Sequence, residues 1–201
     1  MKIVLVRHGR PDEDDMLRSH DPGLRADGRR QACAVAARLA ADGVTRGVSS
    51  PMRRALDTAE PLARRLQLPV ETVDGWAEAD RHRDRYRSTE TLRALGDAAW
   101  QRFLDDPIRY LGGDPQTFHA AVMGALHGLV ESTDADATVA VFTHGLPINL
   151  VLSQLLGLER ITHFQPGYGS ITRLRARNRS RIGIISVNES GHLAPPIDPL
   201  P

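Results

Sequence analysis

The chain has 201 residues, a length typical of one domain with a full hydrophobic core, and we expect a single domain over residues 1–201. Charged residues make up 25% of the chain and the formal net charge is +1, so bulk charge does not indicate a nucleic-acid partner. Cys33 is the one cysteine, which excludes an intrachain disulfide framework and a cysteine-based zinc cluster. We expect Cys33 to be a small core residue within a helix.

The first apolar run, residues 3–6, is too short for the hydrophobic region of a signal peptide. No other stretch approaches the length of a membrane span. The sequence therefore predicts a cytoplasmic protein with no membrane partner.

The chain alternates between strand and helix patterns from its start. Residues 3–6 form a continuous apolar run typical of a strand buried on both faces, and residues 27–41 place apolar side chains at helical spacing. A strand over 44–49, a helix over 51–66 with proline in its first turn, and a short strand over 70–73 follow. This order is typical of a parallel sheet with crossover helices.

Two amphipathic helices come next, over residues 89–104 and 115–130, and Gly112-Gly113 separates them. We expect them to form an inserted helical cap, over about residues 80–133, that roofs a site. A strand over 138–143, a helix over 147–156 and a strand pair over 170–175 and 181–188 complete the pattern, and the tail from Pro195 is expected to be irregular. The order predicts a three-layer α/β/α sandwich with a mainly parallel central sheet and an antiparallel edge strand.

Two short motifs each place a histidine directly after a predicted strand. They are Arg7-His8-Gly9 and Thr143-His144-Gly145. Ligands bind at the carboxyl ends of strands in an open α/β sheet, so a nucleophilic nitrogen beside an arginine at that edge indicates phosphoryl chemistry. His8 would attack phosphorus once its other ring nitrogen is fixed as a donor, Arg7 would hold the phosphoryl oxygens, and His144 would donate to an oxygen that gains charge in the transition state.

A third strand end runs into a helix at Ser49-Ser50-Pro51-Met52-Arg53-Arg54-Ala55. An arginine on the first turn of a helix meets a phosphate together with the positive end of the helix dipole. We select Arg54 for this role. Arg53 and Arg64 are interpreted as solvated helix-surface residues.

A leaving alkoxide needs a proton and the water that follows needs a base, so one carboxyl group with a raised pKa would serve both steps. Glu78 and Asp80 are the candidates, and from the residues alone both stay open. Trp76 stands two positions before Glu78, and apolar packing of that kind raises the pKa of a carboxyl group.

These segments, in this chain order, resemble the histidine phosphatase superfamily in its phosphoglycerate mutase-like branch. Further similarity to that family lies at residues 24–31 with Ala32, Thr58-Ala59, Asn188 and His192-Leu193, so that the resemblance spans residues 1 to about 193. It implies an α/β sandwich, a phosphohistidine on His8, phosphoryl binding by Arg7, Arg54 and His144, and proton donation by Glu78.

Two positions depart from the mutase pattern. Asp14 stands where the mutases carry an asparagine, and Arg10 where a glutamate is common. Asp80-Arg81-His82-Arg83 partly resembles the mutase motif at the acid, which would move the proton donor to Asp80, but Trp76 favours Glu78. The chain is also shorter than typical mutases, which favours a phosphatase.

The leading hypothesis is a phosphatase that hydrolyses a small phosphomonoester through phosphohistidine and uses neither a metal nor a cofactor. The alternatives are a phosphoglycerate mutase-type phosphotransferase, a phosphoprotein phosphatase and a noncatalytic phospho-ligand binding module. Five arginines are candidates for the mouth of the site, where they would favour an acidic substrate: Arg10, Arg81, Arg83, Arg85 and Arg87. Nothing in the residues specifies the natural substrate or an oligomeric state.

Overall fold

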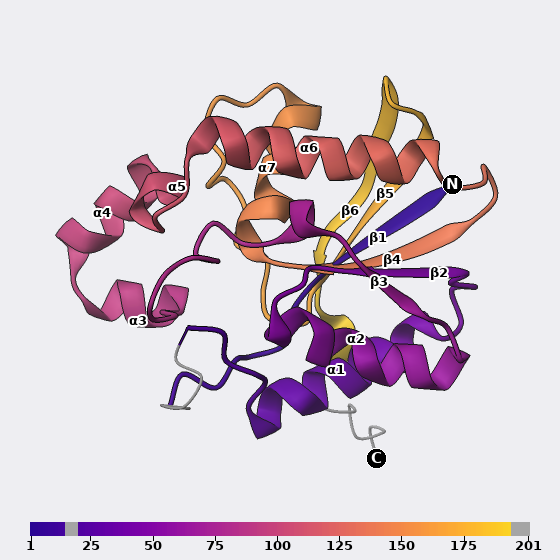
Figure 1. The fold of residues 1–201 in the computed structure, drawn as a ribbon, viewed down its shortest axis with the longest axis horizontal. Coiled ribbons are helices and arrows are strands. Elements are labelled where there is room, and N and C mark those ends of the chain that lie inside the picture. Colours follow the sequence, from indigo (N-terminus) through magenta and orange to yellow (C-terminus); the bar gives the residue numbers. More distant parts are fainter. Residues whose placement is uncertain (15–19, 194–201) are drawn as a thin grey trace, which may run out of the picture.

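The computed structural model describes residues 1–14 and 20–193 and is built around one sheet of six strands (Figure 1). The strands lie in the order β3-β2-β4-β1-β5-β6. Their bounds are β1 Lys2–Arg7, β2 Arg46–Ser49, β3 Val70–Thr72, β4 Thr138–Thr143, β5 Ile171–Asn178 and β6 Arg181–Glu189.

Strands β1 to β4 pair in parallel, and β5 pairs antiparallel with both β1 and β6. The prediction of a mainly parallel sheet with antiparallel pairing at one edge is confirmed. Val6 near the end of β1 lies beside Ile171 at the start of β5. The amino end of β5 therefore lies at the same sheet edge as the carboxyl ends of the parallel strands.

Helices cover both faces of this sheet, which confirms the predicted sandwich (Figure 1). One face carries α1 (Ala26–Leu39) and α2 (Arg53–Leu66), and the other carries α6 (Pro115–Glu131) and α7 (Gly145–Leu156). Three short helices extend from one end of the molecule: α3 (Thr89–Ala94), α4 (Asp97–Asp105) and α5 (Pro107–Tyr110). None of the helices in the described part of the chain is long and apolar enough to span a membrane.

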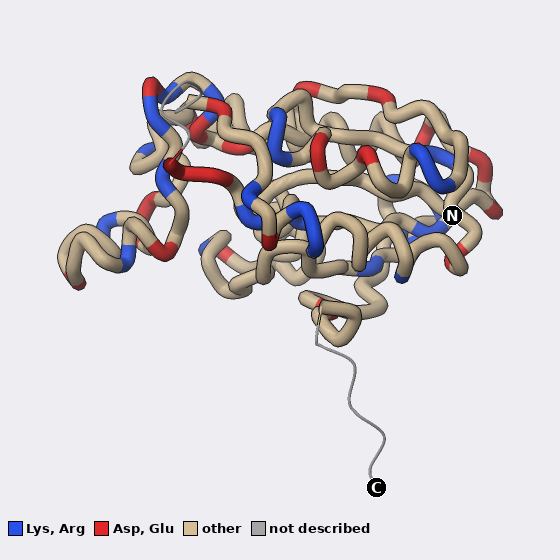
Figure 2. Tube along the Cα trace, turned by 90° about the horizontal axis from the view of Figure 1, so that it is seen from below, with Lys and Arg blue, Asp and Glu red and all other residues tan. Residues whose placement is uncertain are grey.

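Strand β1 shows why its sequence is continuously apolar. Ile3 and Leu5 pack into the core beneath α6 and α7, whereas Val4 and Val6 pack into the core beneath α1 and α2. Because successive side chains of a strand point to opposite faces, a strand covered on both sides needs apolar residues at every position. Basic and acidic positions, by contrast, are interspersed along the trace (Figure 2).

Two expectations were wrong in detail. The helix expected over 89–104 is two helices, because Gly96 between them has φ +98°, a conformation that ends the first helix and that glycine tolerates. Cys33 is exposed, because Ala32, Val35 and Leu39 take the buried face of α1 and leave position 33 toward solvent. The tail from Pro195 lies outside the described residues.

Candidate active site

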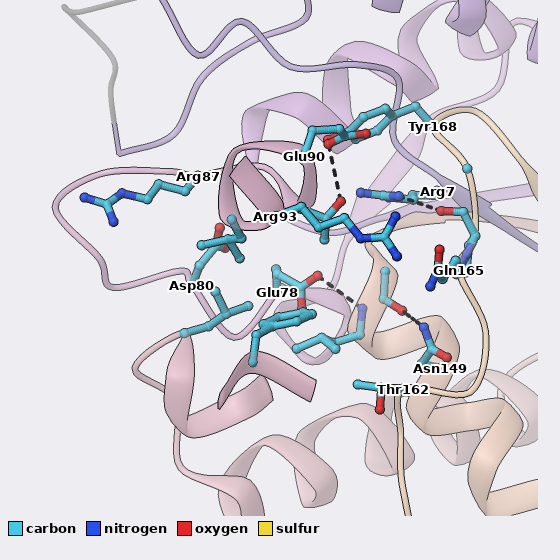
Figure 3. A pocket seen from close by; sticks show the side chains of 18 of the residues that line it. Arg7, Glu78, Asp80, Arg87, Glu90, Arg93, Asn149, Thr162, Gln165 and Tyr168 are labelled. Carbon is cyan, nitrogen blue, oxygen red and sulfur yellow. Dashed lines mark hydrogen bonds between the residues drawn. The ribbon is translucent and has the colours of Figure 1, made fainter. Parts of the chain in front are cut away.

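The segments that end β1, β2 and β4 converge at one edge of the sheet, where a pocket of about 260 Å³ opens (Figure 3). Arg7 is the last residue of β1 and His8 follows it, and Arg54 lies in the first turn of α2, after β2. These three residues line the pocket together with Glu78 and Asp80. His144, which follows β4, is fully buried with its ring centroid 5.0 Å from that of His8.

The ring of His8 is held in one tautomer by its own turn. Its Nδ1 lies 2.8 Å from the carbonyl oxygen of Gly9, which only accepts, so Nδ1 carries the hydrogen and Nε2 carries the lone pair. Burial lowers the pKa of His8 well below 6.5, and the neighbouring Arg54 and Arg7 lower it further. The imidazole is therefore neutral at physiological pH, the state that a nitrogen nucleophile requires.

The Gly9 turn is fixed by close contact with two helices. The Gly9 N–H donates to Thr58 Oγ1 at 2.9 Å, and that hydroxyl donates to the Arg54 carbonyl at 2.6 Å. A Cβ atom at Gly9 would lie 2.5 Å from the carbonyl oxygen of Gly28, so only glycine allows this approach. Thr58 therefore connects the turn that carries His8 to the helix that carries Arg54.

Arg54 has no exposed surface and forms a buried ion pair. Its Nη2 donates to Asp80 Oδ1 at 2.9 Å, and its guanidinium lies 4.6 Å from the ring centroid of Tyr86. Its Nε and Nη1 are buried and make no hydrogen bond with any described residue, although Nη1 lies 3.7 Å from Asp21 Oδ1, within ion-pair distance. Buried N–H groups are rarely left unsatisfied, so a pair of them at a pocket wall indicates a bound acceptor.

Arg7 and His144 leave further donors at the same place. Arg7 Nη1 donates to the carbonyl oxygen of Pro166, and its Nε is buried without a hydrogen-bond partner among the described residues. His144 Nε2 lies 2.7 Å from Ser50 Oγ, and this hydroxyl already accepts from the Met52 N–H at 3.2 Å. The tautomer in which the Ser50 hydroxyl donates to Nε2 places the ring hydrogen of His144 on Nδ1, a buried atom that makes no hydrogen bond within the described chain.

Four buried nitrogens at this place make no hydrogen bond with the described residues: Arg7 Nε, Arg54 Nε and Nη1, and His144 Nδ1. Two guanidinium groups and one neutral imidazole present positive charge and directed N–H groups to one space. A tetrahedral oxyanion, with several oxygens and a negative charge, satisfies such a set.

Glu78 lies half-buried at the same pocket and is held by two backbone donors. Its carboxylate accepts from Ala79 N–H at 3.0 Å and from Leu146 N–H at 3.2 Å. Burial and, to a smaller extent, the nearby charge of Asp80 raise the pKa of Glu78 to about 7, against the lowering effect of the two backbone hydrogen bonds and of Arg54. Asp80, by contrast, is ion-paired with Arg54. A pKa of about 7 lets Glu78 both give and accept a proton near neutral pH, whereas the carboxylate of Asp80 is occupied by Arg54.

Of the five candidate mouth arginines, one lines the pocket and four do not. Among the described residues that line the pocket, Arg87 is the one member of that set. Arg10 is ion-paired with Asp27, Arg81 is ion-paired with Asp74, and Arg83 donates to a backbone carbonyl. Arg85 is exposed. The number of arginines in a segment does not show which of them are ion-paired with a carboxylate in the folded chain.

Several pocket residues were missed by the sequence reasoning, and Tyr168 is the most informative. Its ring centroid lies 4.1 Å from the Arg7 guanidinium and 5.6 Å from the ring centroid of His8, and its hydroxyl donates to Glu90 at 3.0 Å. Tyr168 precedes β5, whose amino end reaches the active-site edge because β5 runs antiparallel. The antiparallel direction expected for this strand was the one feature of the sequence that could have indicated a pocket residue just before β5.

The closing motif supports the segment that carries Tyr168. Asn188 adopts a left-handed conformation with φ +58°, and its side-chain oxygen accepts from the Gly167 N–H at 2.8 Å. His192 Nε2 lies 2.9 Å from the carbonyl oxygen of Gly169. Both residues therefore hold the loop before β5 in place, one on each side of Tyr168.

Comparison with known proteins shows the family and the fold of the chain. The family model of the histidine phosphatase superfamily (branch 1) matches residues 3–189. The probable phosphoglycerate mutase GpmB of Proteus mirabilis is 30% identical over 186 residues, which cover 90% of this chain and 82% of that protein. Phosphoserine phosphatase 1 of Hydrogenobacter thermophilus is 25% identical over 203 residues, covering 96% of this chain and 94% of the relative.

Solved structures show the same similarity. Entamoeba histolytica phosphoserine phosphatase in complex with 3-phosphoglyceric acid superposes with a TM-score of 0.74 at 26% identity, covering 96% of this chain and 99% of the other. The mycobacterial glucosyl-3-phosphoglycerate phosphatase in complex with VO3 also gives a TM-score of 0.74 at 26% identity, with coverage of 93% and 98%. The chain belongs to the histidine phosphatase superfamily, branch 1.

Proposed function

We propose that the protein hydrolyses a small phosphomonoester through a phosphohistidine on His8. The family and the phosphatases among its relatives identify the chain as a phosphoric monoester hydrolase. The observation that carries the mechanism is the set of buried nitrogens on Arg7, Arg54 and His144 that make no hydrogen bond with the described residues, around a neutral His8.

In the first step, the lone pair of His8 Nε2 attacks phosphorus, and the bond between phosphorus and the leaving oxygen breaks. Glu78, protonated because burial raises its pKa to about 7, gives its proton to that oxygen and the alcohol departs. The N–H groups of Arg7, Arg54 and His144 stabilise the charge on the other phosphoryl oxygens. Their charge suffices in this proposal without a metal ion.

In the second step, a water molecule attacks phosphorus while the Glu78 carboxylate accepts its proton. The bond between His8 and phosphorus breaks, the lone pair returns to Nε2, and inorganic phosphate leaves. A pKa of about 7 suits Glu78 to both directions of proton transfer. Asp80 has a positioning role in this scheme, because it holds Arg54 through Nη2.

Hydrolysis is favoured over a mutase reaction by the phosphatases among the relatives and by Asp14 and Arg10 at mutase-specific positions. A mutase remains the second candidate because of the similarity to the probable phosphoglycerate mutase GpmB. It would transfer the phosphoryl group from His8 to a bound hydroxyl compound in place of water.

Initial rates with two aryl phosphates test the proposal in the presence of a chelator. Para-nitrophenyl phosphate has a good leaving group and phenyl phosphate a poorer one, so proton donation matters more for the second. We expect His8→Ala to abolish both activities and Glu78→Gln to lower the rate for phenyl phosphate more strongly. Glu60→Gln, at an exposed position of α2, is the matched control. Activity that survives in His8→Ala, or that the chelator abolishes, would contradict the proposal.

A further inference from the structure

The pocket extends well beyond the space that a phosphoryl group fills, and its outer half is formed by the short helices and the loop before β5 (Figure 3). The apolar residues of that half are Leu92, Trp100, Phe103, Leu104, Leu111 and Phe164. Trp100 and Phe103 are stacked with ring centroids 5.3 Å apart, and Phe103 meets Tyr110 edge to face at 5.8 Å. A leaving group in this space therefore contacts a rigid aromatic wall.

Most polar side chains in the outer half already have partners. Asn149 donates to the Gly145 carbonyl and accepts from a backbone N–H, and the Thr162 hydroxyl donates to the Leu104 carbonyl. The Glu90 carboxylate accepts from the Tyr168 hydroxyl. These groups are engaged within the protein and offer little to a ligand.

Arg93 differs from them. Its guanidinium points into the cavity on the side of Arg7, whereas that of Arg87 points away (Figure 3). Within residues 1–14 and 20–193, Arg93 takes part in none of the ion pairs that the structure shows. It lies 4.7 Å from the ring centroid of Trp100, so the aromatic wall holds it in place. A cation that lies at a pocket wall and forms no ion pair with the described residues can bind an anion from the ligand.

We propose that the leaving group of the substrate combines an apolar body of aromatic size with a second oxyanion, which Arg93 binds. The apolar body packs against Trp100 and Phe103, and the planar fork of Arg93 pairs with a carboxylate or a similar oxyanion. This inference rests on the proposed function, because the same pocket contains His8. It deepens that function by proposing that residues of α3 and α4 select the class of substrate.

Three aryl phosphates separate charge from shape: phenyl phosphate, para-carboxyphenyl phosphate and its uncharged analogue para-carbamoylphenyl phosphate. Glycerol phosphate serves as a small polar comparison. The variant is Arg93→Met, which keeps an apolar stem, and its matched control is Arg102→Met, since Arg102 is exposed on α4 and does not line the pocket. Comparing two probes within each variant cancels differences in leaving-group reactivity.

We expect Arg93→Met to lower kcat/KM for para-carboxyphenyl phosphate about tenfold more than for the carbamoyl analogue, the effect of losing one charge-assisted pair. Arg102→Met leaves that ratio at the native value. The ratio of the dissociation constants for the same two probes is measured by calorimetry in His8→Ala, which lacks the nucleophile, with and without the Arg93→Met substitution. If the native chain hydrolyses none of these esters, the proposed function fails, while the binding ratio still decides the role of Arg93.

Two outcomes would overturn the inference. An equal loss for both aryl probes in Arg93→Met, in catalysis and in binding, would show that Arg93 does not recognise a second charge. Binding of glycerol phosphate as tight as that of phenyl phosphate would show that the aromatic wall does not hold the leaving group.

Discussion

Replacing Glu78 with glutamine should make the protein less active and, above neutral pH, more stable. The pKa of Glu78 lies at about 7 in the folded chain, against an ordinary value of 4.5, mainly because the carboxyl group is buried. As pH rises above about 4.5, the unfolded chain releases this proton before the folded chain does. The free energy of unfolding therefore falls by about 1.4 kcal/mol for each pH unit until the folded group also ionises.

The total loss is about 3 kcal/mol, and about 2 to 3 kcal/mol of it falls between about pH 5 and about pH 8. Glutamine carries no titrating proton, so Glu78→Gln lacks this loss. It also leaves one of the N–H groups of Ala79 and Leu146 without its acceptor, which costs about 1 to 3 kcal/mol at every pH. The pH-dependent part is therefore the signature of the buried carboxyl group.

Urea unfolding in phosphate-free buffer, at about pH 5 and about pH 8, measures this signature. The difference in free energy of unfolding, native minus Glu78→Gln, should fall by about 2 to 3 kcal/mol between the two pH values. Glu60→Gln should show no such change because Glu60 is exposed. A difference for Glu78→Gln that stays constant or rises with pH would refute the raised pKa and with it the choice of proton donor.

Three further outcomes are expected. Arg54→Met should lower kcat/KM about a hundredfold or more, since it removes two of the buried donors, whereas Arg53→Met should have little effect. Equal losses of kcat/KM in the two variants, measured in steady-state assays, would contradict this. Gly28→Ala should lower the free energy of unfolding by about 1 to 3 kcal/mol, because its Cβ would lie 2.1 Å from a carbonyl oxygen. Gly124→Ala should raise the free energy of unfolding by up to about 1 kcal/mol, because a Cβ there meets open space and alanine favours a helix more than glycine does. Tyr168→Leu should raise KM about fivefold by removing the ring beneath the adjacent guanidinium, and Tyr168→Phe, which keeps the ring, should not.

The sheet and its covering helices were predictable because their signals are local. The apolar run at 3–6 requires burial on both faces, and Ile3 and Val4 do pack into opposite cores. The break at Gly96 was missed because the surrounding apolar spacing continues across it, and only the backbone angle shows the end of the helix. Cys33 was misplaced because a small residue fits either face of a helix.

The candidate site was predictable where it follows the carboxyl ends of parallel strands. His8, Arg54 and His144 occupy such positions, and the structure brings all three together. Tyr168 and Arg93 were not found, because they come from an antiparallel strand's amino end and from a short helix. Their places depend on strand direction and on contacts between elements far apart in the sequence.

The most direct test of the account is whether His8 carries the phosphoryl group during turnover. Native protein is mixed rapidly with an aryl phosphate and quenched in alkali, in which phosphohistidine survives, and its peptides are then mapped by mass spectrometry and phosphorus NMR. The account predicts one phosphoryl group on the peptide containing His8, formed as fast as the alcohol is released and absent in His8→Ala. Turnover without such a species, or a phosphoryl group on another residue, would contradict it.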